Sequence, residues 1–164
     1  VMGAKLAGAG RVVAIDPVEH KRALALELGA SDALEGGPGT VEELKAMTDG
    51  GPGRVIETAG SAKVLETAYL ATRRGGITVT VGLPNPEAML SIPAVSLVAE
   101  ERTLKGSYLG SANPREMLPQ LFDYWRAGKL PVEKLISGRL KLDEINEGFD
   151  RLASGEAVRQ IIVL

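Results

Sequence analysis

Short apolar runs alternate with helical segments along the first half of the sequence, and this alternation restricts the possible folds more than any other feature. The runs are brief and rich in β-branched residues, as buried parallel strands are, and they lie at 11–15, 54–58 and 76–81, with a shorter one at 31–34. Helical patterns separate them at 18–28, 40–48 and 61–74. Because the connections are short, the sequence predicts an α/β fold with a doubly wound parallel sheet and right-handed crossovers.

Residues at the ends of two helical segments match known capping preferences. Ser61 is expected to be an N-cap, and Gly75 follows the end of the same helix. Thr40 is expected to open its helix with Glu43 three residues later, as a capping box.

After residue 81 the pattern changes. We expect an edge strand at 90–92, one or two helical turns at 93–98, a further strand of the sheet at 103–108 and a helix at 113–127. A strand–helix–strand extension follows at 136–140, 143–154 and 159–164. The predicted domains are therefore 1–135 for the sheet and 136–164 for the extension.

Charge and composition exclude several classes of protein. The chain has 19 basic and 21 acidic residues with no basic run longer than two, so a nucleic-acid partner is not indicated. No apolar stretch approaches the roughly 20 residues of a membrane helix. With no Cys and one His, neither a disulfide framework nor a zinc ligand set is expected, which fits a cytoplasmic location. Val1 precedes Met2 in a helical pattern, so we expect the tail of a longer protein.

Asp16 carries the sharpest functional indication. It ends a predicted buried strand, where dinucleotide-binding folds place an acid that accepts hydrogen bonds from the adenosine ribose hydroxyls. Its charge disfavours the extra phosphate of NADP and favours NAD. The alternative is that Asp16 only terminates a strand before Pro17. The expected glycine-rich turn would lie about 20 residues earlier, before Val1.

Other candidates have equally plausible structural roles. Lys21 follows five residues after Asp16 and would reach a ribose or phosphate, or be a solvated helix lysine. Thr58 and Val81 begin turns after two strands, where ligands of open α/β sheets bind, although ordinary turns also use such residues. Arg159 would clamp a pyrophosphate or lie on the surface.

Charged residues at two other positions are not expected to be catalytic. Glu57 and Asp32 are interpreted as surface or strand-end charges. The single His20 lies on a helix, so no Ser/His/Asp constellation is expected.

Together these residues resemble the zinc-type medium-chain alcohol dehydrogenases, over essentially the whole chain. The most specific parts are VVAID, VGLP, TLKGSYLG and INEGFDRLASGE. The resemblance is strongest to the class III-like branch, and it implies an NAD-dependent oxidoreductase acting on a small alcohol or aldehyde.

The resemblance also implies roles for individual residues. Asp16 would bind the adenosine ribose with the help of Lys21, and Arg159 would contact the pyrophosphate. The nicotinamide pocket would be lined by Thr58, Val81 and the backbone around Ser107 and Leu109. Zinc, its ligands and the proton relay belong to the family's N-terminal half, so no catalytic or metal-binding residue is expected here. The chain alone is therefore expected to be inactive.

In the family's strand order 3-2-1-4-5-6, the first strand is central and lies before this chain. The runs at 11–15 and 54–58 would each lose a partner, so we expect marginal stability. Family subunits join through a sheet edge, which implies a homodimer through the segment from Leu90 to Val95. Alternatives are a non-zinc, quinone-reductase-like member of the superfamily, a Rossmann-like methyltransferase, and a nucleotide-binding module without activity.

Overall fold

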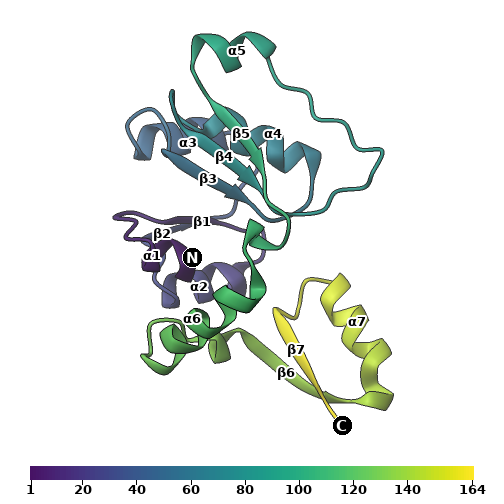
Figure 1. Ribbon diagram of the computed structural model, residues 1–164. Helices are drawn as coiled ribbons and strands as arrows, with labels where there is room; N and C mark the ends of the chain where they lie inside the picture. The colour runs from purple at the N-terminus through teal and green to yellow at the C-terminus, as the bar shows by residue number, and fades with distance from the viewer. The chain divides into compact units, whose positions relative to one another are not determined.

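The computed structural model describes all 164 residues, which form two compact units (Figure 1). The central unit is residues 37–113, and the terminal unit combines residues 1–36 with 114–164. Within the terminal unit an ion pair links the two segments, since Lys134 Nζ lies 2.7 Å from Glu27 Oε1. The domain boundary expected at residue 136 stays a prediction.

A three-stranded parallel sheet organises the central unit. Its strands are β3 (Arg54–Glu57), β4 (Ile77–Thr80) and β5 (Thr103–Gly106), in that order. The helices of this unit are α3 (Thr40–Met47), α4 (Ala62–Ala71) and α5 (Ala94–Ala99), and the 3₁₀ turn η1 (Leu109–Ser111) follows β5. Glu57 pairs with Thr80 and Thr80 with Gly106, so the three strands end at one edge of the sheet.

Tyr69 on α4 is fully buried and contacts both α5 and the residue that precedes β5. Its hydroxyl lies 2.7 Å from Ser96 Oγ on α5, and Ser96 Oγ donates to the Pro93 carbonyl, so the Tyr69 hydroxyl is the donor of the pair. Arg102, which precedes β5, donates from Nη1 to the Tyr69 carbonyl and holds its guanidinium 5.2 Å from the Tyr69 ring centroid. Arg102 Nε also lies 2.5 Å from Glu100 Oε2. A buried polar network therefore joins α4, α5 and β5.

The terminal unit contains two separate pairs of parallel strands. β1 (Val13–Ile15) pairs with β2 (Asp32–Leu34), and β6 (Ile136–Lys141) pairs with β7 (Arg159–Val163). Its other elements are α1 (Met2–Leu6), α2 (Glu19–Glu27), α6 (Pro114–Arg126), η2 (Val132–Leu135), η3 (Leu142–Glu144) and α7 (Ile145–Ala153). In Figure 1, α7 lies beside β6 and β7 at the yellow end of the chain. Gln160 Nε2 on β7 donates to the Gly148 carbonyl on α7 over 2.7 Å, which ties the helix to the strand pair.

The expected fold class is confirmed, because the strands and helices predicted between residues 11 and 81 alternate as expected and all of the strand pairs are parallel. The predicted C-terminal strand–helix–strand extension is β6, α7 and β7. β1 and β3 each have one hydrogen-bonded neighbour, as expected for a Rossmann-like sheet that lacks its central first strand. No helix of the chain combines the length and the apolar content that crossing a membrane requires.

Two local predictions were wrong. Residues 90–92 form no strand, because the Ser91 N–H donates to Glu66 Oε1 on α4 instead of to a strand ladder. Thr40 is not an N-cap: Gly39 takes that position with φ +86°, a conformation that glycine adopts without strain. The Thr40 hydroxyl donates back to the Gly37 carbonyl, so no capping box with Glu43 forms.

Candidate functional site

Asp16 follows β1 directly, and its carboxylate is held by local hydrogen bonds. Oδ1 accepts the Val18 N–H over 2.9 Å, which fixes the side chain in a tight turn. Arg22 Nη1 donates to the Asp16 and Pro17 carbonyls over 2.8 and 2.9 Å, so the loop after β1 is clamped to α2. Asp16 is half-buried and in no ion pair, and Oδ2 has no hydrogen-bond partner in the chain. One carboxylate oxygen is therefore oriented and available to a ligand hydroxyl.

Lys21 and Arg159, the two candidate cations, belong to the same unit as Asp16. Lys21 is half-buried on α2, and its Nζ lies 3.6 Å from the position that a Cβ on Gly155 would occupy. Arg159 begins β7, where the Ser137 hydroxyl accepts its N–H and donates to its carbonyl. Lys21 thus lies beside the turn after α7, whereas no hydrogen bond or ion pair connects Arg159 with Asp16.

Thr58, Val81 and Ser107 come together in the central unit, because each is the residue after one of three strands in register. The Val81 N–H donates to the Glu57 carbonyl and the Ser107 N–H to the Thr80 carbonyl, both over 2.9 Å. These bonds extend the ladder by one residue, so the three residues form a row at the carboxyl edge of the sheet. Leu109 follows in η1 with its side chain 81% exposed.

Glu57, the last residue of β3, is only 3% exposed. Its Oε1 accepts the Gly60 N–H and its Oε2 accepts the Thr80 hydroxyl, each over 2.7 Å. The sequence interpretation as a surface or strand-end charge was therefore correct about the strand end and wrong about the surface. A sequence signal did exist, since a glutamate directly before the turn Thr58-Ala59-Gly60 stands where free backbone N–H groups need acceptors.

Two glycines bring the turns after β3 and β4 into direct contact. A Cβ on Gly82 would lie 2.2 Å from the Gly60 nitrogen and 2.5 Å from its Cα. A Cβ on Gly60, whose φ is +68°, would lie 2.9 Å from the Leu83 carbonyl oxygen. Neither position has room for a larger residue, so the two turns pack backbone against backbone.

Asp32 has a structural role on the surface of the terminal unit. Its Oδ2 accepts a hydrogen bond from Arg11 Nε over 2.8 Å. This hydrogen bond, with the charge of Arg11, lowers the pKa of Asp32 below its usual value, against the smaller opposing effect of burial.

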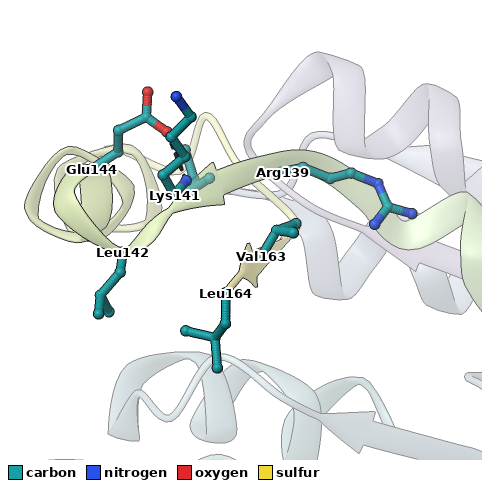
Figure 2. Close-up of a pocket in the computed structure, with 7 residues that line it drawn as sticks. Arg139, Lys141, Leu142, Glu144, Val163 and Leu164 are labelled. Carbon is teal, nitrogen blue, oxygen red and sulfur yellow. Dashed lines mark hydrogen bonds between the residues drawn. The ribbon is translucent and has the colours of Figure 1, made fainter.

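The residues of this chain do not fit a zinc ion, because no three His, Cys, Asp or Glu side chains are grouped to hold a metal. A hollow of about 780 Å³ lies at the end of β6 and β7. It is lined by Arg139, Leu140, Lys141, Leu142, Glu144, Val163 and Leu164 (Figure 2). Figure 2 shows Leu142 and Leu164 projecting on the same side of the strand pair. None of the candidate cofactor residues lines this hollow.

Comparisons with known proteins point to one family. The sequence profile of the zinc-binding dehydrogenases matches residues 1–124. Geraniol dehydrogenase from Castellaniella defragrans is 39% identical over 165 residues, which is 99% of this chain and 44% of the relative. An alcohol dehydrogenase zinc-binding domain protein from Burkholderia ambifaria has a similar structure, with a TM-score of 0.94, 30% identity and coverage of 99% of this chain and 44% of that one.

A third similar protein was solved with a bound dinucleotide. A protein from Sinorhizobium meliloti assigned as a zinc-binding dehydrogenase was solved with NADP bound, and it matches with a TM-score of 0.85 and 25% identity. The match covers 100% of this chain and 48% of that protein. The chain thus spans less than half the length of these relatives.

Proposed function

Because the chain belongs to the zinc-binding dehydrogenase family, we propose that it is the coenzyme-binding part of an NAD-dependent alcohol dehydrogenase. When bound, NAD accepts or donates a hydride at its nicotinamide ring. The chain's own residues hold and orient the coenzyme. The substrate is a small alcohol or its aldehyde, as the names of the relatives suggest.

The arrangement of Asp16 is the observation that carries this proposal. Its Oδ1 is held by the Val18 N–H, which leaves Oδ2 directed by the turn and without a partner. A fixed carboxylate at the end of a parallel strand accepts hydrogen bonds from a ribose diol. The same charge repels a phosphate on that ribose, so the arrangement favours NAD over NADP.

The remaining candidates act on other parts of the coenzyme. Lys21, beside the turn at Gly155, assists at the ribose or a nearby phosphate, and Arg159 contacts the pyrophosphate. Thr58, Val81, Ser107 and Leu109 line the nicotinamide pocket. The first three of these already lie in a row at the carboxyl edge of the central sheet, which is where ligands of open α/β sheets bind.

The chain is proposed to be inactive by itself, because it supplies no zinc ligands and no catalytic residue. In the family these groups belong to the N-terminal half. A cytoplasmic homodimer is proposed from the family resemblance. The dimer contact at Leu90 to Val95 would be made by an irregular segment, since these residues form no strand.

Calorimetric titration of the purified chain with NADH, NADPH and S-adenosylmethionine tests the proposal. We expect NADH to bind more tightly than NADPH. Asp16→Ala should lower the affinity for NADH at least tenfold, since a charge-assisted hydrogen bond is lost. Asp123→Ala, which changes an exposed aspartate of the same unit, is the matched control and should bind as the wild type does. Tighter binding of NADPH, or binding of S-adenosylmethionine alone, would overturn the assignment.

A further inference from the structure

We propose that Glu57 is a positioning residue for the nicotinamide end of the coenzyme site. It fixes the turn Thr58-Ala59-Gly60 against the end of β4, and the fixed turn sets where the nicotinamide ring can lie. This inference rests on the proposed function and adds to it a residue that binds no coenzyme atom itself.

The two carboxylate oxygens of Glu57 reach two different segments of the central unit. Oε1 accepts the Gly60 N–H at the far end of the turn after β3, and Oε2 accepts the Thr80 hydroxyl on β4, each over 2.7 Å. Glu57 also accepts the Val81 N–H at its backbone carbonyl over 2.9 Å. One residue therefore connects the turn after β3 with the last residue of β4 and the first residue beyond it.

Burial makes these contacts strong. Glu57 is 3% exposed, and hydrogen bonds from an amide and a hydroxyl to a carboxylate are stronger than those between neutral groups. Without the carboxylate, the half-buried Gly60 N–H would lose its side-chain acceptor. The hydrogen bond that fixes the far end of the turn would then be lost.

The contact between the two glycines limits how far the turn after β3 can shift. Gly60 and Gly82 touch backbone to backbone, so the turn cannot move toward β4, and the Glu57 carboxylate prevents it from moving away. Thr58 and Val81, which begin these two turns, are thereby held at one spacing. A flat ring bound between such residues requires that spacing to be constant.

The proposed role of Glu57 depends on its hydrogen bonds to Gly60 and Thr80 and not on its negative charge. Two substitutions distinguish these possibilities. In Glu57→Gln the amide oxygen still accepts the Gly60 N–H, and the amide nitrogen donates to the Thr80 hydroxyl, which can accept. Glu57→Ala removes both contacts. Glu66→Ala is the matched control, because Glu66 also accepts a backbone N–H, from Ser91 over 2.9 Å, in the same unit but on α4.

The test compares two ligands by calorimetry, NADH and ADP-ribose, which lacks the nicotinamide ring. We expect Glu57→Ala to lower the affinity for NADH about tenfold and the affinity for ADP-ribose by less than about twofold. Glu57→Gln should restore NADH affinity to within about threefold of wild type. Thr80→Val is a milder change that removes one of the two contacts, so its NADH affinity should lie between those of Glu57→Ala and wild type. Glu66→Ala should bind both ligands as the wild type does.

Equal losses for NADH and ADP-ribose in Glu57→Ala would overturn the inference, because they indicate a general structural defect. Unchanged binding of NADH would overturn it as well. If the wild-type chain binds ADP-ribose and not NADH, the nicotinamide role fails while the assignment of Asp16 stands. If it binds neither ligand, both the proposed function and this role fail for the chain.

Exchange of the Gly60 amide, measured by NMR, tests the clamp independently of any ligand. Protection in wild type and Glu57→Gln, lost in Glu57→Ala, supports the clamp. An unprotected Gly60 amide in the wild-type chain would refute it.

Discussion

Replacement of Gly82 by alanine tests the contact between the turns after β3 and β4. The new Cβ would lie 2.2 Å from the Gly60 nitrogen, whereas non-bonded heavy atoms normally lie about 3.5 Å apart. The turns must therefore separate by about 1 Å, which extends the 2.7 Å bond from Gly60 to Glu57 beyond hydrogen-bond range. Overpacking costs about 1–3 kcal/mol, and a lost hydrogen bond to a charged group about 1.5–3 kcal/mol.

We therefore expect Gly82→Ala to lower the free energy of unfolding by about 3 kcal/mol or more. Gly106→Ala is the control, because Gly106 ends a neighbouring strand, has ordinary φ and has no heavy atom within 4 Å of the added Cβ. Its effect should stay within about 0.5 kcal/mol. The assay is urea unfolding followed by far-UV circular dichroism, because the single Trp125 belongs to the other unit. Equal unfolding free energies for the two variants would refute the reasoning.

Three further predictions concern other contacts. Tyr69→Phe removes the hydroxyl that donates to Ser96 and should cost about 1 kcal/mol in urea unfolding; an unchanged midpoint would contradict the buried hydrogen bond. Because Arg11 lowers the pKa of Asp32, the stabilising pair is present at neutral pH and is lost as pH falls below about 4. The difference in Tm between wild type and Asp32→Asn should therefore shrink from pH 7 to pH 3, and a constant difference would exclude this linkage. Arg22→Ala frees the loop after β1 and should weaken NADH binding severalfold in calorimetry with little change in Tm; unchanged affinity would show that the hydrogen bond from the Val18 N–H to Asp16 is enough to orient the carboxylate.

Local patterns were enough to predict the fold class and to select Asp16 as a candidate ligand of the coenzyme. β-branched runs and helical periodicity are properties of neighbouring residues, so most strands and helices formed where the sequence predicted them. Asp16 was selected as a candidate because its position at the end of a strand is itself a local property. The prediction of an edge strand at 90–92 was wrong, because an edge strand needs a neighbouring strand to pair with. Glu66 accepts the Ser91 N–H instead.

Only the tertiary structure determined which groups Glu57 binds. Its hydroxyl partner Thr80 is 23 residues away, and Gly60 meets Gly82 across two turns of different strands. The row of Thr58, Val81 and Ser107 likewise depends on the register of three strands. The sequence by itself determined which segments become strands, which helices lie between them and which acid ends the first strand. Register, burial and backbone contact were decided by pairing between distant segments, because no local pattern encodes which residues face each other across a ladder.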